Sequence, residues 1–426
     1  MKMDWNKINK QALLMLQEYL KINTSNPPGN EILATDFFEY HLKINQIEFQ
    51  TFTTANKRKI LYAKIKGNNS KKGLMLCSHS DVVPVEKDKW SIEPFGGKIR
   101  NNKIYGRGAI DMKSCTIMQF IAFLLLKKNN QVLNRDVIFC LVPDEEIGSM
   151  YGMSWLIKNK PELLNIEYSL NEGGYGFSDI EINNKPIFGI ANNEKEICQL
   201  KITTFGETGH GSQPNFNNAP LKLTNALAKI HKWHNSNYQH VFSGNKQFFN
   251  AEENKKINDV ELIAMNQITI NITQLHTGNK HNVIPSKAEA ILDCRLPGTI
   301  NREGFITMIK KLLNNPEILV ESISTDEKNM KINCEWDTEL IKIIQSTINK
   351  KFPESKIFPL TSAYATDNRF LRNIGINAYG FIPSLFSAEE RNGFHNHDEY
   401  ITIDNFYLGC EMTYSIISQL CIKIAN

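Results

Sequence analysis

The chain has 426 residues, which exceeds the usual size of a single hydrophobic core and therefore predicts two domains. Hydrophobic residues make up 41% of the chain and charged residues 22%, a composition typical of soluble globular proteins. The net charge of +4 is spread along the chain without a basic block, which argues against a dedicated nucleic-acid surface.

The N-terminal segment, residues 1–22, mixes apolar and charged residues at helical spacing and lacks the continuous apolar core of a signal peptide. No run of about 18 apolar residues occurs, so no membrane span is expected. The eight cysteines are scattered without a CxxC pair, and several, such as Cys77 and Cys140, lie in apolar runs. This pattern predicts reduced core thiols in a cytoplasmic protein rather than a structural zinc cluster.

The first half of the chain alternates between helical and strand-like patterns, which indicates an α/β domain. Residues 82–114 are irregular, with Pro and Gly at several points, and are expected to form a loop held over a site. The expected helices cover residues 5–22, 31–45, 115–127 and 150–159, and the expected strands cover residues 47–53, 60–65, 74–77, 135–143 and 166–170.

One apolar strand ends abruptly in the sequence Ser78-His79-Ser80-Asp81. At such a strand end His79 can bind a metal, and the carboxylate of Asp81 can hold the imidazole in one tautomer and orientation. Many strands end in polar residues, so this feature indicates a site only if the chain supplies further ligands.

Acidic residues follow two other strands of the same domain. Glu145 and Glu146 come after the strand at 135–143, Glu172 comes after the strand at 166–170, and Asp111 lies just before an apolar helix. Because the C-terminal ends of parallel strands gather at one edge of a sheet, these carboxylates and His79 are expected to converge. The alternative is that Asp111 caps its helix and that the acids form a solvated turn.

A converging set of one imidazole and several carboxylates would repel itself unless cations neutralised it. Imidazole and carboxylate ligands together suit zinc, cobalt or manganese. Two metal ions would balance the charge, with Asp111 as a natural bridging ligand.

The pattern changes in the second half, where strands at 197–205, 268–273, 288–295 and 318–324 alternate with helices at 220–234 and 301–314. Two helices on a mostly antiparallel sheet predict an α+β module inserted into the first domain. Residues 238–258 are polar and aromatic and are expected to form a long loop or insertion. Helices at 338–351 and 404–425 follow, and the FHNHDEY segment between them is expected to complete the site.

Taken together, these segments resemble the two-zinc aminoacylase and carboxypeptidase family, which includes aminoacylase I, acetylornithine deacetylase, succinyl-diaminopimelate desuccinylase and the glutamate carboxypeptidases. The likeness is closest to the aminoacylase I branch, through Trp90, Pro94 and Phe95 and the TDNR and HNHDE sequences. The matching segments occur in family order over nearly the whole chain and are SHSDVVPV (78–85), GRGAIDMKS (106–114), VPDEEIGS (142–149), NEGG (171–174), GETGHGSQP (206–214), NVIPSKAEAILDCRLPG (282–298), ATDNRFLRNIG (365–375) and HNHDE (395–399).

This resemblance implies an α/β catalytic domain at residues 1–193 and 327–426, with a mostly parallel sheet flanked by helices. It implies an inserted α+β lid and dimerisation domain at residues 194–326, with an antiparallel sheet and two helices. It also implies two divalent metal ions, taken to be zinc, with cobalt or manganese as alternatives. The implied metal ligands are His79, Asp111, Glu146, Glu172 and His395, with Asp111 bridging the two ions.

For catalysis the resemblance implies that Glu145 is the base and that Asp81 supports His79. His210 is implied to donate to the oxyanion, reaching the site of the neighbouring subunit in a homodimer. Three further residues are implied to hold the substrate, the arginines through a bidentate contact with a carboxylate, namely Asn282, Arg295 and Arg369.

The implied reaction is hydrolysis of the amide bond of an N-acyl amino acid or a small peptide. A water between two cations loses its proton more easily than bulk water, Glu145 accepts that proton, and Glu145 then delivers it to the leaving amine. A dipeptidase or carboxypeptidase, or a deacylase of the acetylornithine or succinyl-diaminopimelate type, would use the same site. A non-catalytic relative would lack a ligand or Glu145, and the chain lacks neither.

Several assignments have alternatives. His397 competes with His395 for the last ligand position, and the family spacing to Glu399 favours His395. Arg295 could instead be a salt-bridged arginine at a sheet edge, whereas Arg107 and Lys113 are expected to be structural. The chain departs from the family at two places, Asn171 and Gly211-Ser212, which affect pocket shape without removing a catalytic group.

Overall fold

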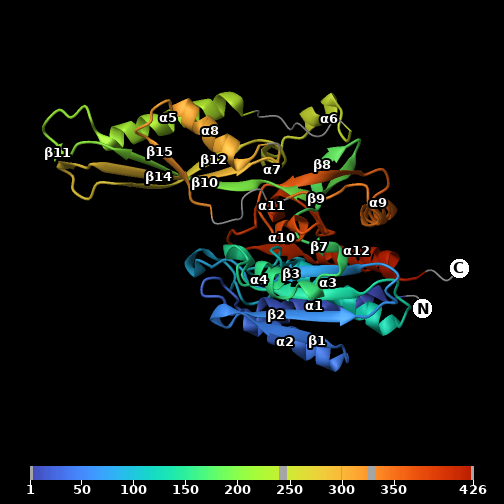
Figure 1. The fold of residues 1–426 in the computed structure, drawn as a ribbon. Helices are drawn as coiled ribbons and strands as arrows, with labels where there is room; N and C mark the ends of the chain where they lie inside the picture. The colour runs from blue at the N-terminus through green and yellow to red at the C-terminus, as the bar shows by residue number, and fades with distance from the viewer. Residues whose placement is uncertain (1–2, 239–246, 299, 325–329, 331, 424–426) are drawn as a thin grey trace. The chain divides into compact units, whose positions relative to one another are not determined.

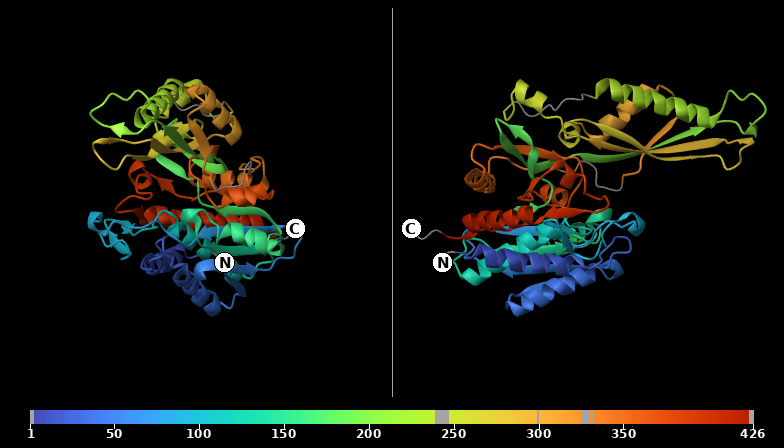
Figure 2. Two further views of the ribbon diagram at one scale, coloured as in Figure 1. Left: turned by 60° about the vertical axis from the view of Figure 1, so that its left-hand side comes forward. Right: turned by 180° about the vertical axis from the view of Figure 1, so that it is seen from behind.

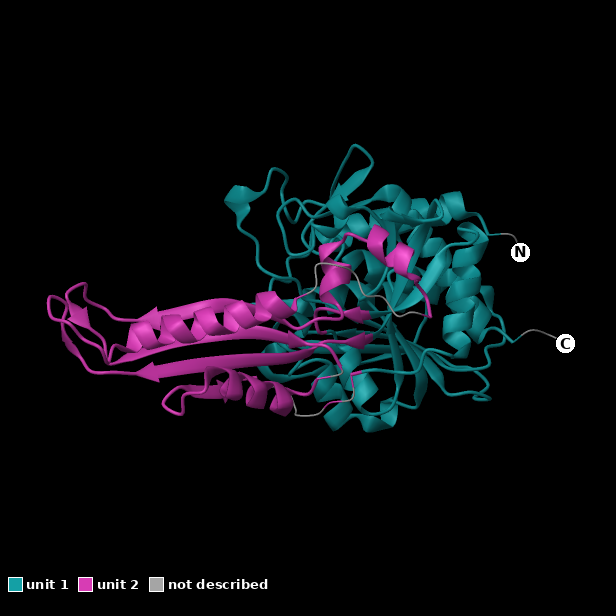
Figure 3. Cartoon of the chain, turned by 90° about the horizontal axis from the view of Figure 1, so that it is seen from above, with its two compact units in different colours: residues 1–192, 333–360, 366–426 teal, residues 193–332, 361–365 magenta. Residues whose placement is uncertain are grey.

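The computed structural model describes residues 3–238, 247–298, 300–324, 330 and 332–423, and the chain forms two compact units. Unit 1 contains residues 1–192, 333–360 and 366–426, and unit 2 contains residues 193–332 and 361–365 (Figure 3). Each unit has its own hydrophobic core, as the change of pattern near residue 194 predicts.

Unit 1 is built on a large mixed sheet (Figure 1). Its central strands are parallel, the strands that flank them pair antiparallel, and the edge strand β18 pairs with β8 in parallel. The central order β6-β3-β7-β17 is the parallel part. The full order is β1 (Phe49–Thr53), β2 (Lys59–Ile65), β6 (Val137–Val142), β3 (Gly73–His79), β7 (Ile166–Asn171), β17 (Asn377–Gly380), β9 (Lys185–Glu194), β8 (Gly176–Ile182) and β18 (Leu385–Phe386), with β16 (Lys356–Ser362) also paired to β9.

Helices cover both faces of this sheet, which explains why every residue of β3 and β6 is buried. On one face, Phe38 of α2 and Phe120 of α3 pack around Phe139 of β6. On the other face, α4 and α10 cover Met75 and Cys77 of β3. The helices of unit 1 are α1 (Trp5–Leu20), α2 (Glu31–Ile44), α3 (Lys113–Asn129), α4 (Met153–Asn159), α9 (Glu339–Lys351), α10 (Asn368–Asn373), α11 (Ala388–Arg391) and α12 (Ile403–Cys421).

Unit 2 contains a four-stranded antiparallel sheet in the order β12 (Thr269–Thr277), β14 (Lys287–Leu296), β10 (Glu196–Phe205) and β15 (Leu319–Ser322). Alternate residues of β10 and β14 are buried against α5 (Ala219–Asn237) and α8 (Arg302–Leu313). Figure 2 shows these two helices along the sheet from two further sides. The predicted α+β module with two main helices is confirmed, and it also has the short helices α6 (Ala251–Lys256) and α7 (Val260–Ala264) and the paired strands β11 (Gly209–His210) and β13 (Val283–Ile284).

Several local predictions are wrong. The region predicted as a loop, 82–114, contains β4 (Lys98–Arg100) and β5 (Lys103–Tyr105), which join β19 (Tyr400–Thr402) in a small sheet. Strands β8 and β9 were not predicted as a pair. Helix α6 falls within the predicted loop 238–258, because Asn250 and Glu253 form a reciprocal capping box there. Residues 239–246 of that loop lie outside the described residues.

All eight cysteines are buried, and none of them is joined to another by a disulfide. No helix in the described part of the chain combines the length and apolar character needed to cross a membrane.

Candidate metal centre

Three neighbouring parallel strands of unit 1 end beside one another and carry the predicted ligands. His79 is the last residue of β3 and lies in register with Val142, the last residue of β6. Glu145 and Glu146 follow β6 in a single 3₁₀ turn, Glu145–Ile147, and Glu172 directly follows β7. Gly380 of β17 allows this packing, because a Cβ there would lie 2.1 Å from the main-chain oxygen of Glu172. The predicted convergence at one edge of the sheet is therefore present.

The two carboxylate oxygens of Asp111 are divided between two imidazoles. His79 Nε2 lies 2.9 Å from Asp111 Oδ1 and 3.3 Å from Glu172 Oε1. His395 Nε2 lies 3.1 Å from Asp111 Oδ2 and 3.3 Å from Glu146 Oε2. Asp111 is thus the shared member of two groups, each with one imidazole and one further carboxylate.

Possible ligand atoms also converge around His79. Those of His79, Asp111 and Glu146 all lie within 4.8 Å of one another, and so do those of His79, Glu145 and Glu172. Such a set of imidazole and carboxylate donors suits a divalent metal such as zinc, cobalt or manganese. Glu146 Oε1 is buried and has no hydrogen-bond partner among the described residues, as expected for an oxygen that binds a metal ion.

The cluster has more carboxylates than its two imidazoles can neutralise. Burial, together with the negative charge of Asp111, raises the pKa of Glu172 to about 8 and that of Glu146 to about 7. Burial, with the charges of Glu172 and Glu146 adding to it, raises the pKa of Glu145 well above its usual range. The three pKa values are raised because burial and the neighbouring carboxylates disfavour the charged forms of these acids.

The imidazoles supply the positive charge that the metal-free cluster has. Burial alone would lower the pKa of His79, but Glu172, Asp111 and Asp81 raise it well above its usual range. Hydrogen bonds with Asp111 and Glu146 raise the pKa of His395 to about 10. The pKa of Asp111 is lowered despite its burial, because both imidazoles contact it. A cation that entered would displace these protons, which is the usual coupling between metal binding and protonation.

Asp81 lies behind the cluster and contacts it in a different way from the one predicted. His79 Nδ1 donates to the main-chain oxygen of Asp81 at 2.9 Å, whereas the carboxylate of Asp81 is 3.7 Å away. That carboxylate accepts hydrogen bonds from the main-chain N–H groups of Glu145 and Glu146, both at 3.1 Å, and from Asn26 Nδ2 at 2.8 Å. Asp81 therefore fixes the turn that carries both glutamates as well as the orientation of His79.

Glu399 holds the loop that carries Asp111. Its buried carboxylate accepts hydrogen bonds from Arg107 Nη1 at 2.7 Å and from the main-chain N–H groups of Gly108, Ile110 and Asp111 at 2.9, 2.7 and 3.2 Å. Since Glu399 lies in the same segment as His395, one side chain joins two of the predicted ligand segments. The structural role expected for Arg107 agrees with this contact, and Lys113 Nζ donates to the main-chain oxygen of Ile22 at 2.6 Å.

The structure brings His395 rather than His397 into the cluster. His395 makes the two contacts with Asp111 and Glu146, and its side chain is 53% exposed. His397 Nδ1 is buried without a hydrogen-bond partner among the described residues, and no ion pair links it to the cluster there. The half-exposed imidazole of His395 is the most exposed of the five ligand candidates, while the side chain of Asp111 is 15% exposed.

The remaining predicted residues lie elsewhere. His210 and Asn282 are neighbours in unit 2, where β11 pairs with β13 and Gly211 N donates to the main-chain oxygen of Asn282 at 2.9 Å. His210 is exposed and its Nδ1 lies 2.7 Å from Ser212 Oγ. Arg295, also in unit 2, makes a bidentate pair with Asp293 at 2.7 and 3.1 Å.

Arg369 lies in the first turn of α10 in unit 1 and is buried, with its guanidinium 4.8 Å from the ring centre of Phe370. The roles of Arg369, His210, Asn282 and Arg295 toward substrate stay predictions.

Two contributors to the centre were not predicted from the sequence, namely Asn26 and the carboxylate contacts of Glu399. Asn26 belongs to the NTSNPPG segment, which has the composition of an ordinary turn. The only available signal was a polar side chain before two prolines, and that signal does not point to a partner 55 positions away.

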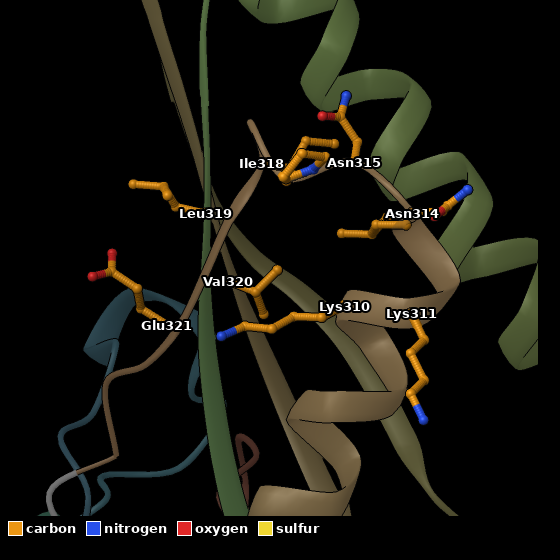
Figure 4. Close-up of a pocket in the computed structure, with 10 residues that line it drawn as sticks. Lys310, Lys311, Asn314, Asn315, Ile318, Leu319, Val320 and Glu321 are labelled. Carbon is orange, nitrogen blue, oxygen red and sulfur yellow. The ribbon is translucent and has the colours of Figure 1, made fainter.

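A groove of about 560 Å³ in unit 2 does not have the chemistry of this centre (Figure 4). It lies beside the C-terminal end of α8 and strand β15, and its polar lining includes Lys310, Lys311 and Glu321 but no histidine. The candidate metal centre is therefore defined by its side chains in unit 1 and not by this groove.

Residues 75–419 match the family model described as "Peptidase family M20/M25/M40". The chain is 30% identical over 418 residues to aminoacylase-1 from Dictyostelium discoideum, covering 96% of this chain and 97% of that one. It is 30% identical over 400 residues to the probable carboxypeptidase S-like 1 of the same organism, covering 89% of this chain and 80% of that one. Among solved structures, the M20 family metallo-carboxypeptidase Sso-CP2 from Sulfolobus solfataricus aligns with a TM-score of 0.71 and 22% identity, covering 96% of this chain and 98% of that one. The matched region contains every residue of the cluster.

Proposed function

We propose that the chain, which belongs to peptidase family M20/M25/M40, hydrolyses the amide bond of N-acyl amino acids. Membership of this family shows that the chain is a metal-dependent hydrolase of amide bonds in N-acyl amino acids or peptides, as its sequence predicts. The likeness to aminoacylase-1 over 97% of that relative supports an N-acyl amino acid as the substrate. The observation that carries the mechanism is the division of Asp111 between two imidazole–carboxylate pairs.

The metal content that we propose is two divalent ions, with zinc as the first candidate and cobalt or manganese as alternatives. His79 and Glu172 would hold one ion, His395 and Glu146 would hold the other, and Asp111 would contact both. The fit rests on the donor set, on the unpartnered buried oxygen of Glu146 and on the raised pKa values of Glu146 and Glu172. When bound, two such ions lower the pKa of a shared water and polarise the amide carbonyl.

Glu145 is the group that we propose to move the proton. It lies in the cluster with His79 and Glu172, and its raised pKa suits a carboxylate that accepts a proton from the attacking water and returns it to the leaving nitrogen. Asp81 keeps Glu145 in place through the Glu145 N–H. The products are a carboxylate and an amino acid.

The other proposed roles concern the substrate and a second subunit. His210, from a second copy of the chain in a homodimer, would donate to the oxygen of the attacked carbonyl. Asn282, Arg295 and Arg369 would hold the substrate, the arginines through its carboxylate. The buried cysteines, none of which is in a disulfide, support a reducing compartment, and we place the protein in the cytoplasm.

A carboxypeptidase acting on short peptides is the second candidate function. The carboxypeptidase S-like relative and the metallo-carboxypeptidase structure favour it. Turnover of a panel of N-acyl amino acids and matched dipeptides separates the two functions, because the proposal expects the acyl compounds to have the higher kcat/KM.

The mechanism is tested with Glu145→Gln, which keeps the size of the side chain and removes its basicity. We expect kcat to fall by about 10²–10⁴ because the proton acceptor is lost, while the protein keeps two bound ions by elemental analysis. Glu162→Gln, at an exposed glutamate of unit 1, is the matched control and should keep wild-type turnover. Wild-type kcat in Glu145→Gln would refute the role of Glu145.

A further inference from the structure

A buried network of charged and polar side chains lies behind the turn that carries Glu145 and Glu146. Its members are all buried, although they come from separate parts of unit 1: the loop after α1, the start of α2, the residue before β2 and the ends of β3 and β6. We call this set the Arg58 network, and its residues are Asn26, Glu31, Arg58, Asp81 and Asp144. None of them is assigned as a metal ligand.

Arg58 is the only cation of this network and contacts three of its members. Its Nη1 forms ion pairs with Glu31 and, at 3.2 Å, with Asp144 Oδ1. Its Nη2 donates to Asn26 Oδ1 at 2.9 Å. One guanidinium therefore contacts two carboxylates and one amide at the same time, with donors on two separate nitrogens of a planar group, whereas a lysine ammonium has all its donors on one nitrogen.

Two of these contacts lead directly to the catalytic turn. Asn26, held by Arg58 through its oxygen, donates through Nδ2 to Asp81 Oδ2 at 2.8 Å. Asp81 in turn accepts the main-chain N–H groups of Glu145 and Glu146. The chain of contacts from Arg58 to the main chain of both glutamates has no gap.

Asp144 forms the second connection. It has a φ of 76°, a left-handed conformation that is uncommon for residues other than glycine, although aspartate and asparagine adopt it more readily than most. Arg58 holds Asp144 Oδ1, and the N–H of Tyr151 donates to Asp144 Oδ2 at 3.0 Å. Because Asp144 directly precedes Glu145, its conformation sets the direction in which the turn leaves β6.

We propose that Arg58 is a positioning residue for hydrolysis, acting through Asn26 and Asp144 to hold the main chain of Glu145 and Glu146 in its working geometry. This inference rests on the proposed function, because it assumes that Glu145 moves the proton. Glu31 has a different part in the network, since it balances the charge of Arg58 without contacting the turn.

A purely structural role for Arg58 makes a different prediction. A buried arginine that only stabilises the fold would affect the melting temperature and leave kcat unchanged in the protein that stays folded. A positioning residue affects kcat even where the fold is intact, because a displacement of about 1 Å in a catalytic group can cost about 10²-fold in rate.

The experiment compares Arg58→Met and Arg58→Lys with Arg135→Met in the full-length metal-loaded protein. Arg135 is a matched control because it is a fully buried arginine of unit 1 that pairs with Glu167 at 3.0 Å and Glu339 at 3.1 Å, outside the network. For Arg58→Met we expect kcat on an N-acyl amino acid to fall about 10- to 100-fold, with KM within about threefold and two ions still bound. Arg58→Lys should be intermediate, and Arg135→Met should lower the melting temperature with kcat unchanged.

Two further variants keep the test decisive if Arg58→Met does not fold. The double variant Glu31→Gln with Arg58→Met removes one of the uncompensated carboxylates, so it should recover stability but not kcat. Asn26→Ala leaves Arg58 in place and removes its link to Asp81, together with a 3.5 Å hydrogen bond from Asn26 Nδ2 to Asp144 Oδ1, and it should lower kcat about tenfold.

The outcomes distinguish the inference from the proposed function. If the wild-type protein is active but the double variant and Asn26→Ala keep its kcat within twofold, Arg58 is structural and the inference is wrong. If the wild-type protein hydrolyses neither N-acyl amino acids nor dipeptides, the proposed function fails and the inference falls with it.

Discussion

The predicted site residues of unit 1 and those of unit 2 have opposite surroundings. In unit 1 the candidate ligands are mostly buried, and they contact partners that are distant in the sequence, such as Asp111 with His395. In unit 2 the side-chain hydrogen bonds of His210 and Arg295 are local, since His210 contacts Ser212 and Arg295 contacts Asp293, each only two residues away. The ligand candidates of unit 1 therefore form a centre within a single chain. The roles proposed for His210 and Arg295 in unit 2 depend instead on a second subunit or on the substrate.

The variant that tests the difference between the two units with the largest expected effect is at His210. We expect His210→Ala to lower kcat by about 10²–10³ with both ions retained, because a donor to the developing oxyanion is lost. Mixing His210→Ala with Glu145→Gln should then restore about one quarter of wild-type activity, since half of the dimers in a twofold-symmetric mixture have one site that is intact in both residues.

Two results would contradict this role for His210. One is a mixture that stays inactive although mass spectrometry detects the mixed dimer. The other is a wild-type protein that is fully active as a monomer by sedimentation. Either result would leave His210 as a local surface residue of unit 2.

The burial of the cluster in unit 1 leads to a pH dependence of metal binding. In the metal-free protein the pKa of Glu146 is about 7, that of Glu172 about 8 and that of His395 about 10, so these groups carry protons at pH 6. Metal ions need the deprotonated forms, so raising the pH from 6 to 8 should strengthen metal binding by about tenfold or more per pH unit.

Calorimetric titration of the metal-free protein with zinc in two buffers of different ionisation enthalpy measures this proton release. More protons should be released at pH 6 than at pH 8. Binding with the same affinity and no proton release at both pH values would show that the cluster is not the metal site.

The smallest expected effect concerns Arg295. Its pair with Asp293 is partly exposed and should contribute less than about 1 kcal/mol to stability. We expect Arg295→Met to raise KM about tenfold with kcat nearly unchanged, as for the loss of a charge-assisted hydrogen bond to a substrate carboxylate. Steady-state kinetics with Asp293→Asn as the control checks this, and an unchanged KM would assign Arg295 to the sheet alone.

Local sequence patterns predicted the part of the metal centre that lies at the ends of the parallel strands. His79, Glu145 and Glu172 could be placed together because each follows a buried parallel strand, and parallel strand ends must meet. His395 could not be placed in this way, because it lies in an irregular segment late in the chain. Its polar, histidine-containing composition indicated the FHNHDEY segment, and only the family resemblance singled out His395 as the ligand.

The supporting residues were harder to predict for the same physical reason. Asn26, Arg58 and Glu399 act through side-chain contacts between segments that are far apart in sequence, and no spacing or periodicity encodes such a contact. The small sheet of β4, β5 and β19 was predicted as loop because its strands are only three residues long and pair with a segment almost 300 positions away.

Asp111 is proposed to be a ligand of both ions, and the metal content of Asp111→Asn tests this role most directly. An amide oxygen is a poor bridge between two cations, so elemental analysis should find two divalent ions per wild-type chain and fewer than one per Asp111→Asn chain, with hydrolysis reduced to background. Asp404→Asn, at an exposed aspartate of unit 1, should keep both ions. An Asp111→Asn protein that still holds two ions and hydrolyses its substrate at the wild-type rate would contradict the account.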